Sequence, residues 1–161
     1  GAVRIGTYSP DGTEVCYDIL KPGEFFGNLQ YLNGQFSEFS KALTTVHLRA
    51  YDPSYFKSII VNIPEISEWF NIQLVSRWCR AEDRLFAVRS LDASEKVRRI
   101  TSHFQDQILD GKGNKINLMN LLTLQDIADL TGLTRQTVSK VLKEEFFSFS
   151  SKTSRIKRKV F

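Results

Sequence analysis

The sequence predicts an α+β fold in which a partial antiparallel β-roll comes first and helices follow. Three observations lead to this prediction. Runs of β-prone residues separated by turn residues fill the first 52 positions, a long amphipathic stripe starts at Pro64, and two short amphipathic runs flank Gly132. We therefore expect a β-roll domain at residues 1–63, a long helix at 64–91 and a C-terminal domain at 92–161.

The composition is that of an ordinary globular protein, with 42% hydrophobic and 25% charged residues among 161. No run approaches the roughly 20 apolar residues of a membrane-spanning helix, and no signal-peptide pattern opens the chain. Cys16 and Cys79 are too few and too far apart for a disulfide framework, so we expect a cytoplasmic protein without membrane contact. The chain starts at Gly1 inside a predicted strand, without an initiator methionine, and we expect an N-terminal segment to precede it.

Charge is distributed unevenly along the chain. Residues 1–91 contain 9 Lys and Arg against 10 Asp and Glu, whereas residues 92–161 contain 13 against 8. This asymmetry indicates that the C-terminal part meets a polyanion.

The N-terminal runs predict antiparallel strands. "AVRIGTY" and "TEVCYDIL" flank the turn "SPDG" and predict a β-hairpin. The β-branched run "KALTTVHLRAYD" predicts another strand, which ends at Asp52-Pro53. These strands fit a roll or barrel.

Two helices are predicted to follow, a short one over "PSYFKSIIVN" and a long one over 64–91. The long helix is either a core helix lying across the β-domain or one strand of a coiled-coil-like dimer seam. We favour the seam because the stripe runs for roughly 40 Å at 1.5 Å per residue, further than so small a β-domain could cover. Trp69 and Phe86 lie off the stripe and are expected to face the β-domain. The seam residues are Ile66, Phe70, Leu74, Trp78, Ala81, Leu85 and Val88.

The C-terminal domain begins with Asp92 and Glu95, which have the spacing of a capping box. We expect the helix that they start to end at Gly111, followed by the turn "GKGN" and a short extended stretch, "KINLMNLL".

The segment "LTLQDIADLTGLTRQTVSKVLKEE" predicts a helix-turn-helix. Thr123 can cap a first helix with Ile127, Ala128 and Leu130 inward, and Gly132 supplies a positive-φ turn. Thr134 can cap a second helix whose buried side holds Val138, Val141 and Leu142. The alternative is a helical hairpin whose polar face is merely solvated.

The exposed face of the second helix has residue types that read DNA. Arg pairs with guanine O6 and N7, and Gln with adenine N6 and N7. We predict that the bases are read by Arg135, Gln136, Ser139 and Lys140, and that phosphates are contacted by Gln125, Thr134 and Thr137. The basic segment "FFSFSSKTSRIKRKVF" predicts a hairpin wing along the phosphate backbone, with Lys152, Arg155 and Lys157, although a frayed basic tail is the alternative.

This order of parts resembles the cAMP receptor protein/FNR family of bacterial regulators. The resemblance is carried by the helix-turn-helix segment and, more loosely, by "GTYSPDGTEVCYDILKPGEFFGNL". It implies a cyclic-nucleotide-binding-like roll and a homodimer on a two-fold promoter site of double-stranded DNA, with RNA polymerase a further candidate partner.

The ligand cassette departs from the pattern of cyclic-nucleotide binders in that family, which have Gly-Glu-Leu and, about ten residues on, Arg-Ser/Thr. Here the trio is Gly27-Asn28-Leu29, and the later stretch "GQFSEFSKAL" offers Ser40 and Lys41 but no Arg. Glu38 would repel a phosphate, and Lys cannot reproduce the fork of Arg. We therefore expect no response to cAMP, although another small effector stays open.

No cofactor and no catalytic activity are predicted. Two cysteines cannot supply the four ligands of an iron–sulfur cluster, and His47, His103 and Cys16 have no ligand-like spacing. The chain has no nucleophile–base pair and no P-loop frame. A ligand-binding module that governs another protein is the alternative function, and it would leave the polar helix face without a purpose.

Overall fold

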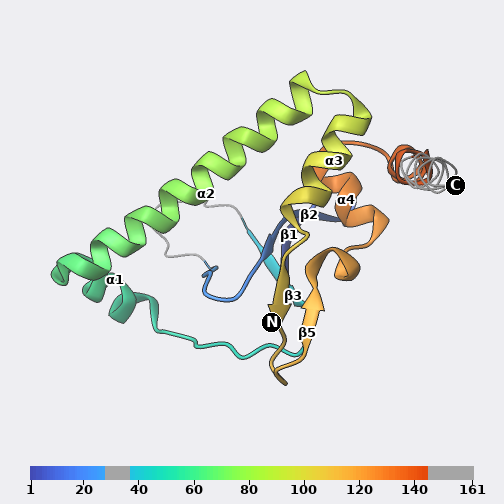
Figure 1. Cartoon of the computed structure of the whole chain (residues 1–161). Coiled ribbons are helices and arrows are strands. Elements are labelled where there is room, and N and C mark those ends of the chain that lie inside the picture. Colours follow the sequence, from blue (N-terminus) through green and yellow to red (C-terminus); the bar gives the residue numbers. More distant parts are fainter. Residues whose placement is uncertain (28–36, 145–161) are drawn as a thin grey trace, which may run out of the picture.

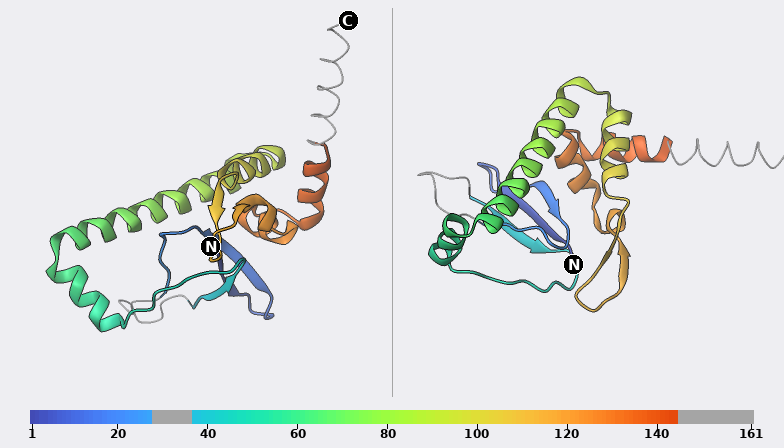
Figure 2. Two further views of the ribbon diagram at one scale, coloured as in Figure 1. Left: turned by 60° about the horizontal axis from the view of Figure 1, so that its bottom comes forward. Right: turned by 60° about the vertical axis from the view of Figure 1, so that its left-hand side comes forward.

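The computed structural model describes residues 1–27 and 37–144. A three-stranded sheet lies between a long helix, α2, and the C-terminal helices, as Figure 1 shows. The two further views in Figure 2 show α2 as an arm that extends well past the sheet toward α1. None of the described helices is both long and apolar enough to cross a membrane.

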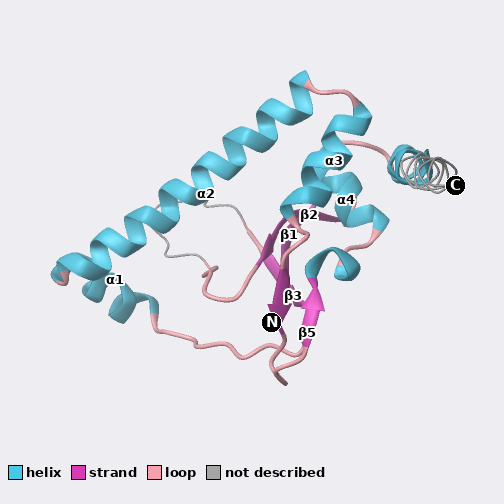
Figure 3. Ribbon diagram, in the orientation of Figure 1, coloured by secondary structure: helices cyan, strands magenta, loops and turns pink. Residues whose placement is uncertain are grey.

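The predicted N-terminal hairpin is confirmed. Strand β1 (Val3–Tyr8) pairs antiparallel with β2 (Glu14–Leu20), and the pairing register shifts between Ile5 and Gly6. In the connecting turn the carboxylate of Asp11 accepts from the backbone N–H of Thr13 at 3.2 Å. A third strand, β3 (Phe39–Ala42), pairs with the other edge of β1, which gives the order β2-β1-β3 seen in Figure 3.

The strand predicted over "KALTTVHLRAYD" is wrong beyond Ala42. The last bond of this ladder is the one that the N–H of Leu43 donates to Ala2 O at 2.9 Å, because β1 runs antiparallel to β3 and begins at Val3, opposite Ala42. Residues 45–52 have no strand conformation. Thr45 O instead accepts from the N–H of Gly111 at 2.5 Å, which ties this stretch to the C-terminal domain.

The two predicted helices after residue 52 are confirmed as α1 (Pro53–Asn62) and α2 (Pro64–Ser90). Asp52 caps α1 by accepting from Tyr55 N–H at 2.9 Å. Pro64 opens α2 directly after the C-cap of α1, so that the two helices form a corner at the far end of the arm.

The face of α2 that meets the sheet is lined by arginines. Arg77 donates to Phe25 O at 3.3 Å, Arg80 lies 2.6 Å from a Glu24 carboxylate oxygen, and Arg84 lies 3.0 Å from an Asp18 carboxylate oxygen. Spacings of three and four residues place all three on one side of the helix. Polar contacts therefore make up much of the attachment of α2 to the hairpin and the loop after it.

The C-terminal domain begins at α3 (Ala93–His103), whose N-cap Asp92 accepts from Glu95 N–H at 2.9 Å. The prediction that this helix reaches Gly111 is wrong. Phe104 ends it, and the chain continues as β4 (Gln107–Leu109), which pairs antiparallel with β5 (Lys115–Asn117). Neighbouring side chains of β4 point to opposite faces, so that Ile108 is buried whereas Leu109 is exposed. A 3₁₀ helix, η1 (Leu118–Leu121), and helix α4 (Leu124–Thr131) follow.

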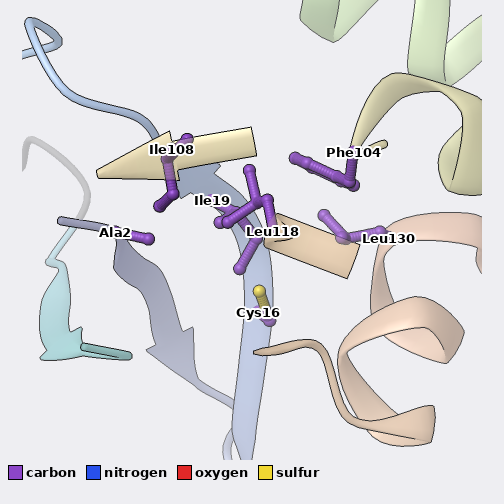
Figure 4. Packing of buried hydrophobic residues seen from close by; sticks show 7 residues of the cluster. All are labelled: Ala2, Cys16, Ile19, Phe104, Ile108, Leu118 and Leu130. Atoms are coloured by element: carbon purple, nitrogen blue, oxygen red, sulfur yellow. The ribbon is translucent and has the colours of Figure 1, made fainter. Parts of the chain in front are cut away.

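One apolar cluster is shared between the hairpin and the C-terminal domain, as Figure 4 shows. Ala2, Cys16 and Ile19 come from the sheet, and the remaining members are Phe104, Ile108, Leu118 and Leu130. Cys16 and Phe104 have at most 1% of their surface exposed. The packing therefore joins segments that the sequence analysis assigned to separate domains.

We predict that Phe104→Ala destabilises the sheet and the C-terminal domain together, by about 3–5 kcal/mol, because it empties the centre of the shared cluster. Chemical denaturation followed by circular dichroism measures the loss. The matched control is Leu109→Ala in β4, whose side chain is 53% exposed and whose change should stay within about 0.5 kcal/mol. Two separate unfolding transitions in the parent protein would contradict a shared core.

Candidate nucleic-acid interface

The first helix of the predicted helix-turn-helix is α4, and its N-terminus is closed by a complete capping box. Thr123 Oγ1 accepts from Asp126 N–H at 3.1 Å, and the Asp126 carboxylate accepts from Thr123 N–H at 2.8 Å. The three residues predicted to face inward, Ile127, Ala128 and Leu130, are each 1% exposed. The cap and the inward face of α4 are thus as predicted.

The turn depends on Gly132, which has φ 65° and ψ 27° in the left-handed region. Its N–H bonds back toward the end of α4, and Leu133 N–H donates to Ala128 O at 3.0 Å. A Cβ at position 132 would lie 3.1 Å from Val88 Cγ1. Both the backbone conformation and the close approach of α2 therefore favour glycine.

The second helix covers residues 135–144 within the described part of the chain. Thr134 caps it by accepting from Thr137 N–H at 3.2 Å, and the two hydroxyl oxygens lie 2.9 Å apart. Val138 and Val141 are buried against α3 and α4 residues, and Leu142 packs on the same cluster. This packing fixes which side of the helix faces solvent.

The four residues predicted to read bases lie on the solvent side of this helix. Arg135, Gln136 and Lys140 are exposed, and Ser139 is partly exposed between them. Lys140 Nζ lies 4.0 Å from a Glu144 carboxylate oxygen, in a pair in which both side chains are more than half exposed. A pair with this exposure is worth little and leaves Lys140 able to turn to another anion.

Lys143 belongs to the same face and was missed by the sequence analysis. It is exposed and follows Gln136 by seven residues and Ser139 by four. That spacing returns a helical residue to the same side, so the signal was present in the sequence.

The residues predicted to contact phosphates are only partly placed by the structure. Gln125 is exposed, and its amide donates to Asp129 Oδ1 at 2.7 Å. Thr134 and Thr137 are bonded to each other at the start of the second helix. The wing residues Lys152, Arg155 and Lys157 lie outside the described residues.

The cassette is also partly described, because Asn28 and Leu29 lie outside the described residues. Gly27 has φ 114°, in the region that favours glycine. Ser40 and Lys41 lie on β3, and Lys41 forms an ion pair with Glu14 on β2. The nearby Glu38 forms a hydrogen bond that, after burial, is the main cause of the raised pKa of Tyr17.

The predicted seam on α2 is only partly solvent-facing. Leu74, Trp78 and Leu85 are 43%, 67% and 60% exposed, and Ala81 is exposed as well. Phe70 is 5% exposed and contacts the rings of Phe25 and Phe56, so its place in an intermolecular seam is wrong.

The ends of the stripe turn toward the chain's own core, because a spacing of mostly four residues drifts around a helix with 3.6 residues per turn. Ile66 is half-buried, and Val88 approaches Gly132. Trp69 does contact Phe25, with ring centroids 5.9 Å apart. Phe86 is 57% exposed, and its expected position on the β-domain side is wrong.

Cys16 and His47, the other residues considered for cofactor or metal binding, have contacts within the protein. Burial raises the pKa of the Cys16 thiol to about 11, which keeps the thiol protonated at neutral pH. His47 Nε2 lies 2.8 Å from Gly111 O. Among residues 1–27 and 37–144, no three His, Cys, Asp or Glu side chains gather so as to hold a metal ion.

Known proteins are similar to parts of this chain. Residues 121–144 match the model of "Bacterial regulatory proteins, crp family", which covers α4, the turn and the second helix. A "CRP-like cAMP-activated global transcriptional regulator" of Mycobacterium tuberculosis, in strains CDC 1551 and H37Rv, is 30% identical over 100 residues. That match covers 62% of this chain and 45% of the relative, so the chain spans about half the length of the curated relatives that it matches.

Solved structures agree with the fold. FixK2 from Bradyrhizobium japonicum superposes with a TM-score of 0.65 at 19% identity, over 92% of this chain and 72% of that one. A cyclic nucleotide-binding domain containing protein from Listeria monocytogenes EGD-e gives 0.58 at 10% identity, over 89% and 68%. The match at residues 121–144 is thus to the crp family of bacterial regulatory proteins, and the fold of the chain is similar to those of the two solved structures.

We predict that Gly132→Ala destabilises the protein by more than the left-handed backbone alone, which costs about 1–2 kcal/mol. The matched control is Gly12→Ala, because Gly12 has φ 82° and nothing within 4 Å of an added Cβ. Urea unfolding should show Gly132→Ala to be worse by about 1 kcal/mol, as for other overpacked sites. The excess should vanish in a Val88→Ala background, and an excess that persists there would contradict the contact with α2.

Proposed function

We propose that this protein is a sequence-specific regulator of transcription that binds a two-fold promoter site as a homodimer in the cytoplasm. The observation that carries the proposal is the exposed face of residues 135–144, which presents Arg135, Gln136, Ser139 and Lys140 on a capped helix. Arg135 and Gln136 stand in its first turn, which is the part of a recognition helix that meets base edges in the major groove.

The charges on this helix also support DNA binding. Apart from Glu144, the described part of this helix carries only cationic and neutral polar side chains on its exposed face. An acid among the groove-facing residues would repel phosphates, and Glu144 lies about two and a half turns from Arg135. Lys143 extends the cationic face toward the phosphate backbone.

We expect selection from a pool of random duplexes to recover a palindromic sequence, and Arg135→Ala to abolish its enrichment. Loss of one bidentate base contact should cost about 1–3 kcal/mol, which is roughly 5- to 150-fold in Kd. Lys112→Ala, in the turn between β4 and β5, is the control for the loss of one positive charge. If the parent protein enriched no duplex sequence, the proposal would be contradicted.

The salt dependence of DNA affinity distinguishes residues that read bases from residues that contact phosphates. Lys143→Ala should weaken binding to all sequences alike and reduce the log–log salt slope by about 0.9. Arg135→Ala should instead relax the preference at particular base positions. Equal behaviour of the two variants would mean that the assignment of Arg135 to base reading is wrong.

The homodimer is proposed from the apolar surface that α2 leaves exposed. Leu74, Val75, Trp78, Leu85 and Phe86 are each at least 43% exposed in the single chain. Large apolar side chains that follow one another along a long helix mark an interaction surface. A second copy of α2 offers a self-complementary partner, and two recognition helices would then meet half-sites about 34 Å apart.

We predict that Trp78→Glu converts the dimer to monomer in sedimentation velocity, because it places a charge in the middle of this surface. Tyr55→Glu is the matched control, since Tyr55 on α1 is also an aromatic residue and is 59% exposed. A Trp78→Glu protein that keeps the sedimentation coefficient of the parent would contradict pairing through α2.

The proposed regulator does not respond to cAMP. Lys41, the cation of the cassette, is paired with Glu14, and Glu38 adds a carboxylate where a phosphate would need a cation. The Mycobacterium tuberculosis relative is described as cAMP-activated, so the departure concerns these residues rather than the family. Saturating cAMP should change the affinity for the selected palindrome less than twofold, and a larger change would overturn this part of the proposal.

A further inference from the structure

A cleft of about 510 Å³ opens where α2, α3 and α4 meet, at the chain reversal between α2 and α3. Its volume falls within the range of about 300–1,000 Å³ that is typical of small-molecule sites. It differs from the cassette described above, which is built from the loop after β2 and from β3. It also lies apart from the DNA-facing side of residues 135–144, none of which lines it.

The floor of the cleft is apolar. Ala87 of α2 and Leu130 of α4 are 8% and 1% exposed, and Val88 and Ile100 complete the lining beside them. Thr131 adds no free hydroxyl, because its Oγ1 donates within α4 to Ile127 O at 2.6 Å. A ligand that fills this space therefore needs an apolar body.

The rim of the cleft is cationic. Five Lys and Arg side chains line it against two carboxylates, those of Asp83 and Glu95. Arg80 and Arg84 are paired with Glu24 and Asp18, which lie outside the lining. The two carboxylates are already paired, with Arg99 and Arg98 respectively. His103, at the same rim, has its pKa lowered first by burial and then by Lys21, Arg84 and Arg80, as expected where positive charges gather.

Two donors in this rim have no partner among the described residues. Arg80 Nε is buried without an acceptor, although the same guanidinium reaches Glu24 through Nη1. Lys96 is half-buried on α3, and its side-chain ammonium has no hydrogen bond or ion pair within residues 1–27 and 37–144. A buried donor without an acceptor is costly, which applies to Arg80 Nε, whereas the half-exposed ammonium of Lys96 is free to accept an anion as its partner.

We propose that this hinge cleft binds a small organic anion that has an apolar body and a carboxylate, sulfonate or phosphate head. The head lies against Lys96 and Arg80, and the body lies on Ala87, Ile100 and Leu130. Because the lining comes from α2 on one side and from α3 and α4 on the other, the ligand bridges the long helix and the helix-turn-helix. The inference does not depend on DNA binding.

The test uses 1-anilinonaphthalene-8-sulfonate, which combines an aromatic body with one anionic group and fluoresces in apolar sites. We expect saturable binding of one probe per chain to the full protein. Lys96→Gln should weaken it about tenfold, as for loss of one charge-assisted hydrogen bond, whereas Lys96→Arg should retain it within about twofold.

Control variants separate the cleft from other surfaces. Lys112→Gln removes one cation from a distant turn and should not change binding to the probe. Octanoate should displace the probe and inorganic phosphate at the same concentration should not, because phosphate has no body for the apolar floor.

Four results would overturn the inference: binding that does not saturate, binding unaffected by Lys96→Gln, a loss in Lys112→Gln equal to that in Lys96→Gln, or displacement by phosphate as effective as by octanoate. Circular dichroism of Lys96→Gln, a substitution at a half-exposed polar side chain, checks that the fold is retained.

Discussion

The carboxylate of Asp126 holds the sheet to the helix-turn-helix. It is 2% exposed, and one oxygen lies 2.7 Å from Arg4 Nε on β1 while the other accepts from the N–H and hydroxyl of Thr123. The same group therefore caps α4 and neutralises the half-buried arginine. Arg4 Nη1 also lies 3.1 Å from a Glu14 carboxylate oxygen, so that this arginine joins β2 to α4. The orientation of α4 on the sheet thus depends on a contact that apolar packing alone would not specify.

A second polar contact and the shared cluster fix that orientation. Cys16 N–H on β2 donates to Asp129 Oδ2 at 2.8 Å, which satisfies an edge donor of the sheet with a residue of α4. Beneath it, Phe104 and Leu130 pack on Cys16 and Ile19. Strain at the sheet is therefore passed directly to the helix that positions the turn at Gly132, because tightly packed interiors deform little.

The sequence was most informative where a local requirement of the backbone is met by one kind of residue. Thr123 and Gly132 predict the ends of α4 because capping and positive φ are local requirements. The short strands β4 and β5 escaped prediction because three residues are too few for alternation to be seen, and Phe104 ends α3 through burial in a distant cluster. Lys143 was missed although its spacing was visible in the sequence. That the Lys96 ammonium has no ionic partner among the described residues follows only from the fold.

Helix α2 shows why its apolar stripe was difficult to assign. Arg84 joins it to β2, and Arg77 and Arg80 join it to the loop after β2; a sequence pattern places these arginines in solvent, whereas Trp78 and Leu85 remain exposed. Ion pairs weaken with salt, and their geometry can change at small cost in free energy. Apolar contacts are not weakened by salt, and closely packed side chains do not change geometry so readily. If α2 pairs with a second copy as proposed, its apolar side chains contact the partner. Its arginine side chains then hold the chain's own hairpin and the loop after it. A change in the roll would then shift α2 against its own sheet more readily than it would separate the two chains.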